Sequence, residues 1–307
     1  MNTLPRDRQI QAIASLCEGV SIRATERLTG IHRDTIMRLG VQVGQGCATL
    51  HDRLMRQLHV NRIEIDEIWS YVGKKRQHVK PGDSWELGDQ YVFIALADSA
   101  KAIVGYRIGK RDGVTTHGFI SDLRQRVVNE PEFSSDAFTQ YPSAVEAYFG
   151  DRIAYGTIEK HYSVTHAKEA SRRYSPGHVV DVTKSRISGR PTHISTSYVE
   201  RQNLTIRMQQ RRFTRLTNAF SKKLGNHAAA VALYAAHYNF CRVHETLRLT
   251  PAMQLGVTDH VWTIAELIEA ALKGEPSAPP SSIPPAPLSP SPLQRRLSFK
   301  VIKGGVS

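Results

Sequence analysis

The chain has 307 residues, of which 41 are Lys or Arg and 28 are Asp or Glu, so its formal net charge is +13. Only 22% of the residues are charged and 40% are hydrophobic, which excludes a disordered polyelectrolyte and permits ordinary hydrophobic cores. No apolar run approaches the ~18 residues of a membrane span and the charged start excludes a secretory signal, so we expect a soluble, cytoplasmic protein whose partner is a polyanion and not a membrane.

Residues 6–43 are predicted to form a compact helical unit. Apolar side chains recur at helical spacing before Gly19, which ends the first predicted helix. Ser21 is a suitable N-cap for a second helix over 22–28, and Gly30 allows a tight turn before a third helix over 33–41. Two short helices around a glycine-containing turn are typical of the helix-turn-helix motif, whose second helix enters the major groove of DNA.

The start of that second helix carries the groove-facing side chains of such a motif. Here the residues expected to contact DNA are Arg33, Thr35 and Arg38. One departure is Glu26, four residues before Gly30, where the motif usually has a small residue. A plain helical bundle without a role in DNA binding is therefore the alternative.

From residue 61 the spacing of apolar residues changes from helical to strand-like. Before it, Gly44 and Gly46 are predicted to loosen the chain, and a helix over 50–58 is predicted to serve as a linker. Beyond it we expect strands over 63–71, 91–97 and 103–108, a helix over 116–128, a strand over 132–136, a helix over 143–149, a strand over 153–164, an irregular basic loop and a helix from residue 197. This order predicts a mixed α/β fold, and it matches the ribonuclease-H-like topology.

A further helix is expected over 226–240, and the eight prolines of residues 276–292 predict a disordered tail. The predicted domains are a helix-turn-helix domain (1–45), a linker helix (46–60), a ribonuclease-H-like catalytic domain (61–258), a closing helix (259–273) and a Pro-rich tail (274–307).

Most of the excess positive charge lies between residues 184 and 223. A run of charges is often only a solvated face, but this one has a single acid, Glu200, and so leaves its charge available to phosphates. Its ten basic residues are Lys184, Arg186, Arg190, Arg201, Arg207, Arg211, Arg212, Arg215, Lys222 and Lys223.

Three acids stand at positions where they invite a chemical explanation. Asp66 lies within an otherwise apolar strand, where an unpaired carboxylate costs several kcal/mol, so either a divalent cation or a neighbouring arginine is expected to compensate it. Asp136 ends a short strand, the usual place for functional groups in α/β folds, although a helix N-cap is the simpler interpretation. Glu200 fits a capping box that begins at Ser197.

Glu200 also heads a helical stripe that continues through Asn203, Arg207 and Arg211, an arrangement suited to a metal ion beside a phosphate backbone. Mg²⁺ prefers carboxylate oxygens and phosphates as ligands. Two Mg²⁺ or Mn²⁺ ions held by three converging carboxylates could activate the attacking oxygen and stabilise the leaving oxygen at phosphorus. We find no phosphate-binding glycine loop and no histidine spacing typical of a metal site.

Several segments carry a resemblance to a known family. Residues 65–75 (IDEIWSYVGKK), 197–207 (SYVERQNLTIR) and 211–223 (RRFTRLTNAFSKK) resemble the bacterial DDE transposases of the insertion-sequence-one type. Residues 237–247 (HYNFCRVHETL) and 250–253 (TPAM) resemble the same group, so the likeness extends over about residues 61–258.

The resemblance implies a transposase that binds double-stranded DNA at the ends of its element, works as a homo-oligomer on DNA in the nucleoid, and catalyses metal-dependent 3′-end cleavage and strand transfer. It implies that Asp66, Asp136 and Glu200 form the acidic triad, and that Asn203 and Arg207 orient Glu200 and hold the DNA backbone. Three neighbouring acids, Glu67, Asp98 and Asp112, do not fall at the motif positions of the triad.

The front of the chain departs from this family. Its smaller members often begin with a cysteine-ligated zinc ribbon, whereas Cys17, Cys47 and Cys241 are widely spaced and odd in number, which predicts neither a zinc site nor a disulfide framework. Recognition of the element's ends is then expected of residues 6–43. Two alternatives are a catalytically inert DNA-binding repressor or decayed transposase, and a nuclease with the same fold.

Overall fold

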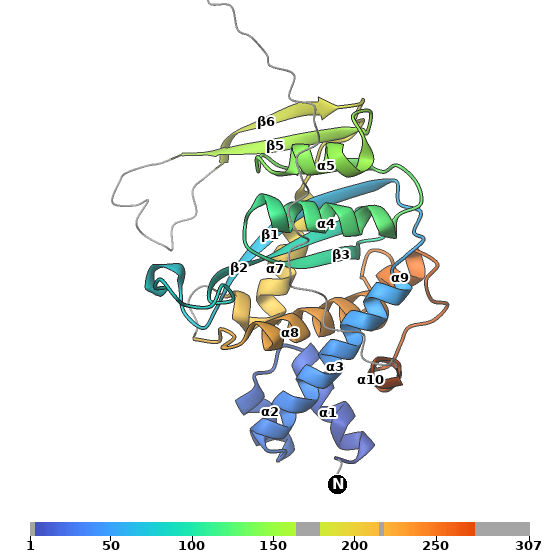
Figure 1. The fold of residues 1–307 in the computed structure, drawn as a ribbon. Coiled ribbons are helices and arrows are strands. Elements are labelled where there is room, and N and C mark those ends of the chain that lie inside the picture. Colours follow the sequence, from blue (N-terminus) through green and yellow to red (C-terminus); the bar gives the residue numbers. More distant parts are fainter. Residues whose placement is uncertain (1–3, 164–178, 215–217, 274–307) are drawn as a thin grey trace, which may run out of the picture.

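The computed structural model describes residues 4–163, 179–214 and 218–273 (Figure 1). Within them six strands form one sheet in the order β3–β2–β1–β4–β5–β6. The strands are β1 (Arg62–Val72), β2 (Gly88–Ala97), β3 (Ala102–Gly109), β4 (Glu132–Asp136), β5 (Tyr155–Tyr162) and β6 (Val179–Ser188). β1, β2 and β3 are antiparallel neighbours, and β4 and β5 run parallel to β1. This is the predicted mixed α/β fold with ribonuclease-H-like strand order.

Helices cover both faces of the sheet (Figure 1). On one face, α4 (Gly113–Arg126) and α5 (Tyr141–Phe149) pack Phe119 and Tyr141 against Phe93 of β2. On the other face, α7 (Ser197–Gln209) and α8 (Leu224–Ala236) pack against Ile68 and Ile94. β1 is therefore buried on both sides, which explains why its isoleucines do not follow a simple alternation.

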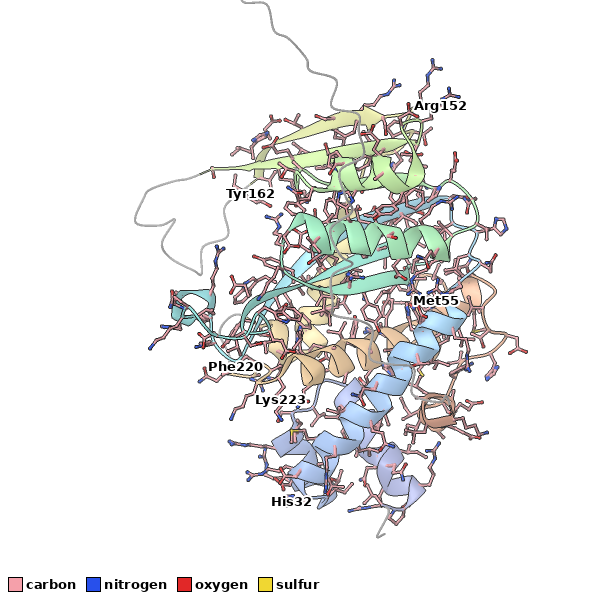
Figure 2. All side chains as sticks on the ribbon, in the orientation of Figure 1. His32, Met55, Arg152, Tyr162, Phe220 and Lys223 are labelled. Carbon is pink, nitrogen blue, oxygen red and sulfur yellow. The ribbon has the colours of Figure 1, made fainter. Side chains whose placement is uncertain are left out.

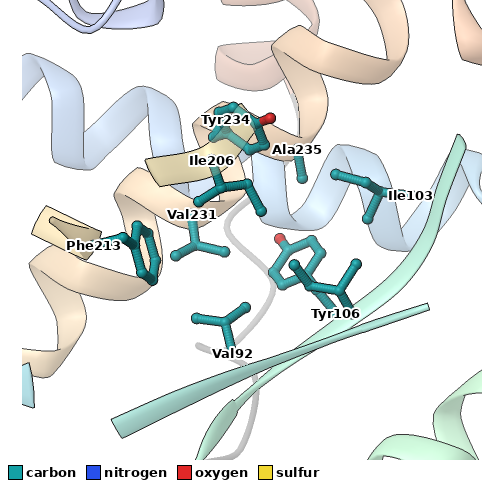
Figure 3. Close-up of a pocket in the computed structure, with 9 residues that line it drawn as sticks. Val92, Ile103, Tyr106, Ile206, Phe213, Val231, Tyr234 and Ala235 are labelled. Atoms are coloured by element: carbon teal, nitrogen blue, oxygen red, sulfur yellow. The ribbon is translucent and has the colours of Figure 1, made fainter. Parts of the chain in front are cut away.

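Apolar side chains of the sheet and of helices α7 and α8 face one another across a small void (Figure 3). The void left there is about 10 Å³, which is no larger than one water molecule. It is lined by Val92, Ile94, Ile103, Tyr106, Ile206, Phe213, Val231, Tyr234 and Ala235. This region is core packing that fixes α7 on the sheet.

The N-terminal helices are α1 (Arg6–Cys17), α2 (Ile22–Thr29) and α3 (Arg33–Leu54). The predicted break at Gly44 and Gly46 is wrong, because α3 runs through both. A Cβ atom on Gly44 would lie 2.2 Å from the Ala229 carbonyl oxygen, and one on Gly46 would lie 2.0 Å from that of Ala271. The glycines therefore permit close helix packing and do not loosen the chain, and the predicted boundary at residue 45 falls within one helix.

The described residues differ from the predicted elements at two further places. The separate linker helix is wrong, since its first half is the end of α3. Part of the predicted basic loop is the strand β6, whose residues are almost all exposed, so no buried face imposes an apolar alternation on its sequence. The other elements are η1 (Arg76–His78), η2 (Arg211–Phe213), the π-helix η3 (His237–Cys241), α9 (Pro251–Gln254) and α10 (Ile264–Lys273).

The helix α10 agrees with the predicted closing helix. The predicted Pro-rich tail, residues 274–307, lies outside the described residues. Among the helices that are described, none is long and apolar enough to cross a membrane.

Candidate active site

Three acids meet where β4 ends beside β1. Asp66 and Glu67 of β1 and Asp136 at the end of β4 each place one carboxylate oxygen within 4.8 Å of the others. β4 pairs in parallel with residues 62–65 of β1 only, so Asp136 ends its strand next to Asp66. Such an edge, at the carboxyl ends of neighbouring parallel strands, is where open α/β sheets present functional groups.

Asp66 is held from two sides. Its Oδ1 accepts the backbone N–H of Glu67 at 2.8 Å, and its Oδ2 accepts a hydrogen bond of 2.8 Å from Nδ2 of Asn203 on α7. Burial, with the neighbouring charges of Glu67 and Asp136, raises the pKa of Asp66 to about 7. The group therefore concentrates negative charge that a cation would relieve.

Glu67 is enclosed by the fold, with a side chain that is 4% exposed. It forms an ion pair with Arg111 and accepts a 2.7 Å hydrogen bond from the Tyr141 hydroxyl. Its pKa is raised by burial and by Asp136. Glu67 was not predicted as a site residue, because it does not fall at a motif position of the triad. Strand alternation turns Asp66 and Glu67 to opposite faces of β1, and both lie close to Asp136 at the end of β4.

Arg111 links two members of the acid group. Its guanidinium reaches Asp136 Oδ2 at 3.5 Å as well as Glu67, and it lies 4.2 Å from the centre of the Phe138 ring. Asp136 Oδ1 also accepts the backbone N–H of Phe138 at 3.0 Å. A neighbouring arginine was one of the two predicted ways to compensate Asp66, but Arg111 pairs instead with Glu67 and Asp136.

Glu200 is oriented differently from the other two predicted triad members. Its carboxylate forms an ion pair with Lys160 of β5 and accepts a 2.7 Å hydrogen bond from Thr196 Oγ1. It is not among the three acids that lie within 4.8 Å of one another, although its charge contributes, after burial and nearer groups, to the raised pKa of Asp66 and of Asp136. The structure thus brings Asp66 and Asp136 together and leaves Glu200 facing a lysine.

The start of α7 is not capped by the predicted box. In place of Glu200, the buried Glu64 of β1 accepts the backbone N–H groups of Tyr198 and Val199 at 2.8 and 2.9 Å. A carboxylate at a helix N-terminus satisfies unpaired N–H groups and complements the helix dipole. Glu64 and Asp66, two residues apart on one face of β1, therefore both fasten α7 to the strand that carries the acid group.

The other acids that the sequence analysis rejected have structural partners. Asp98 is buried and pairs with Arg62 at 2.7 Å. Asp112 caps α4 by accepting the backbone N–H of Thr115 at 2.8 Å. Neither joins the acid group.

The turn between α2 and α3 explains the departure at Glu26. Gly30 adopts a left-handed conformation at φ 68°, and Glu26 Oε1 accepts the backbone N–H of Arg33 at 2.8 Å. The glutamate therefore caps the start of α3, a role that a small residue could not fill. His32, which precedes α3, lies at the end of the helical unit away from the sheet (Figure 2).

Most residues predicted to contact DNA have accessible side chains. Arg33, Arg38, Arg201, Arg211, Lys222 and Lys223 are exposed, and Thr35 and Arg207 are half-buried. Arg38 and Lys223 also line one open hollow of about 290 Å³ between α3 and the start of α8. The basic segment thus comes close to the predicted groove-facing helix.

Two of the residues predicted to contact DNA have polar partners within the protein, and a third cannot be placed. Asn203 is 3% exposed and donates to Asp66, so it is turned to the acid group. Arg212 donates to Ser221 Oγ at 2.7 Å and to the Asn226 carbonyl at 3.3 Å, and burial lowers its pKa to about 10. Arg215 lies outside the described residues.

Comparisons with known proteins add little to this geometry. No family model matches the chain, and no curated protein matches it. Among solved structures, the chain is similar to a crystal structure of the Mos1 strand transfer complex, with 12% sequence identity over 77% of this chain and 78% of that one, at a TM-score of 0.21.

Proposed function

We propose that the protein is a DDE transposase that binds the terminal inverted repeats of a bacterial insertion sequence and catalyses 3′-end cleavage and strand transfer. The observation that carries the proposal is the meeting of Asp66, within β1, and Asp136, at the carboxyl end of the neighbouring parallel strand β4 of a ribonuclease-H-like sheet. The helix bearing Glu200 is bonded to the same strand through Asn203. The sequence motifs around Asp66 and Glu200 give the same assignment.

The donor set suits a hard divalent cation. The acid group offers only carboxylate oxygens, which Mg²⁺ and Mn²⁺ prefer, and it lacks the sulfur and imidazole ligands typical of zinc. Asp66 and Asp136 are the proposed ligands, with Glu200 as the third and Glu67 as the buried support. When bound, two such ions would supply Lewis-acid assistance at phosphorus and an activated water or 3′-hydroxyl.

The chain's own groups have separate tasks in this proposal. Asn203 orients the Asp66 carboxylate through its amide, and Arg111 with Tyr141 holds the Glu67 carboxylate in place beside it. Glu200 becomes a ligand only after its carboxylate leaves Lys160. The lysine is then positioned to pair with a phosphate of the DNA strand in the site.

The accessible cations of α3, of α7 and of the segment before α8 support a DNA surface. Arg33 and Arg38 on α3 are proposed to contact the element's ends, and Arg201, Arg207, Arg211, Lys222 and Lys223 to hold the phosphate backbone near the site. Salt would weaken such binding steeply, because each phosphate contact releases counterions. Two copies acting together on paired DNA ends remain part of the proposal.

The test is a strand-transfer reaction. Purified protein is incubated with Mn²⁺, a labelled duplex that carries the inverted repeats flanking its gene, and a supercoiled target plasmid. The proposal expects 3′-end nicking and a labelled product joined to the plasmid. Cuts without joined product would indicate a nuclease, and binding without cuts would overturn the enzymatic proposal.

One observation favours the inert DNA-binding alternative. Lys160 forms an ion pair with Glu200, and Arg111 forms one with Asp136. In a decayed transposase that binds no metal, such ion pairs would neutralise the carboxylates. The same strand-transfer reaction separates the two, because an inert protein would shift the labelled duplex in a gel at every Mn²⁺ concentration without cutting it.

A further inference from the structure

Beyond the acid group, β1 continues as a strip of aromatic rings. Trp69 and Tyr71 follow Glu67 on one face of the strand, and their ring centres are 5.7 Å apart. Phe220 stacks on Tyr71, with centres 4.8 Å apart and planes inclined by 26°. We call these three residues the aromatic strip. All three are half-buried, so each retains surface that faces solvent.

The strip lies where the helical layer ends. Further along β2, Phe93 is covered by Phe119 of α4 and Tyr141 of α5. Trp69 instead pairs across the sheet with the half-buried Tyr91. Rings that served only the core would be expected under the helices, and these stand beyond them.

Backbone interactions of the next residue, Ser221, hold Phe220 beside β1. Ser221 forms a parallel bridge with Val72 at the end of β1, and its carbonyl accepts the N–H of Gly73 at 2.8 Å. The edge of β1 between Asp66 and this bridge pairs with no strand among the described residues. A polymer could therefore follow this edge from the acid group to Phe220.

The charges beside the strip fit a nucleic acid. Lys75 Nζ lies 6.0 Å from the centre of the Tyr71 ring, and Lys222 and Lys223, which follow Phe220 after one residue, have exposed side chains. Phe220 and Lys223 lie on the same side of the molecule (Figure 2). Aromatic rings flanked by cations are the usual platform on which the bases of single strands stack, while the cations hold the phosphates.

We propose that the aromatic strip binds unpaired nucleotides of the DNA strand whose phosphate lies at the acid group. This inference rests on the proposed function. Bases in an intact duplex are stacked on one another and cannot reach protein rings, so the occupant is a strand separated at the DNA end. From Glu67 to Tyr71 the strand β1 advances about 13 Å, so a tail of a few unpaired nucleotides is long enough to reach from the acid group to the aromatic strip.

The test compares two DNA probes without metal. One is a blunt duplex of arbitrary sequence. The other is the same duplex with a tail of four unpaired nucleotides that include the fluorescent base 2-aminopurine. The tailed duplex is made in two forms, with the tail on the 3′ strand or on the 5′ strand. We expect the protein to bind one tailed duplex on the order of tenfold more tightly than the blunt one and to quench the tail. In the double variant Tyr71→Leu/Phe220→Leu the preference and the quenching should disappear, while affinity for the blunt duplex should not change.

Two controls separate stacking from folding. Trp85 is 51% exposed and lies outside the strip, so Trp85→Leu should retain the preference. Phe220→Tyr keeps the ring and should also retain it, and the melting temperatures identify any variant that does not fold. Equal binding of both probes by the wild type, or a preference that survives in the double variant, would overturn the inference and leave the proposed function standing. Failure to bind either probe would overturn both.

Discussion

Glu64 on β1 accepts the backbone N–H of Val199 on α7 at 2.9 Å, and both residues are buried. This bond joins the strand that carries Asp66 to the helix that carries Glu200. Two of the three predicted triad members therefore owe their relative position to a carboxylate that takes no part in the proposed chemistry.

Replacing Glu64 tests this joint. Glu64→Ala leaves two buried N–H groups without an acceptor and should lower the free energy of unfolding by about 2 kcal/mol. Glu64→Gln keeps an acceptor oxygen and should cost less than half of that. Urea denaturation measures both. A loss below about 0.5 kcal/mol for Glu64→Ala would show that the start of α7 is held by other contacts.

The crowded acids predict a response to metal that needs no DNA. Burial and the neighbouring acids raise the pKa of Asp66 to about 7 in the folded chain. The free energy of unfolding therefore falls as the pH rises through that value and Asp66 becomes charged. Without metal at pH 8, Asp66→Asn should therefore be more stable than the wild type, by about 1–3 kcal/mol. Excess MnCl₂ should raise the melting temperature of the wild type and leave that of Asp66→Asn unchanged. An equal rise in both would place the metal elsewhere.

Lys160 forms an ion pair with Glu200, the proposed third metal ligand, so the proposal predicts that it competes with a cation for this carboxylate. Removing its charge in Lys160→Met should lower the Mn²⁺ concentration that gives half of the thermal shift several-fold, because a positive charge beside a cation site weakens binding. Lys184→Met, a loss of the same charge from the exposed strand β6, is the matched control and should change little. If Lys160→Met weakens Mn²⁺ binding, Lys160 orients Glu200 and does not compete for it.

Two buried histidines predict a loss of stability in mild acid. Burial, with Arg212 nearby, lowers the pKa of His227 to about 3, and burial with Arg126 does the same for His51. Since both must stay neutral in the folded chain, their contribution is complete above pH 6.5 and falls as the pH drops toward 3. Between pH 7.5 and 5.5 each should cost about 1 kcal/mol.

The effect of His227 on stability is measured by comparing a variant with the wild type, because the raised pKa of Asp66 changes the unfolding free energy in the opposite direction. His227→Gln should reduce the loss of unfolding free energy between the two pH values by about 1 kcal/mol relative to the wild type. The exposed His59 gives the control variant His59→Gln, which should keep the wild-type loss. Identical losses in all three proteins would mean that His227 is protonated in the folded chain.

The sequence predicted what depends on local patterns. The succession of strands and helices along the chain followed from the spacing of apolar residues. Asp66 was identified because an unpaired acid inside an apolar strand is costly, and Asp136 because functional groups in α/β folds often lie at strand ends. What it missed depends on contacts across the fold. Gly44 and Gly46 signal a break locally but serve packing against α8 and α10.

Two further misses have the same cause. Asp66 and Glu67 lie on opposite faces of β1, and Glu67 joins the acid group only because Asp136, at the end of β4, is close to both. The strand β6 lacks the apolar alternation of a half-buried strand because both of its faces are exposed. Glu26, by contrast, could have been recognised: an acid seven residues before the first turn of α3 reaches back across the tight turn at Gly30 to cap that helix.

The most direct test of the account is the effect of Asp66→Asn on DNA chemistry. Wild type and variant are incubated with Mn²⁺ and the labelled terminal repeats, and binding and 3′-end cleavage are measured in the same samples. The account predicts equal binding and a loss of cleavage of at least about a thousandfold in the variant, because an amide cannot replace a carboxylate at a metal. Cleavage by Asp66→Asn at the wild-type rate would contradict it.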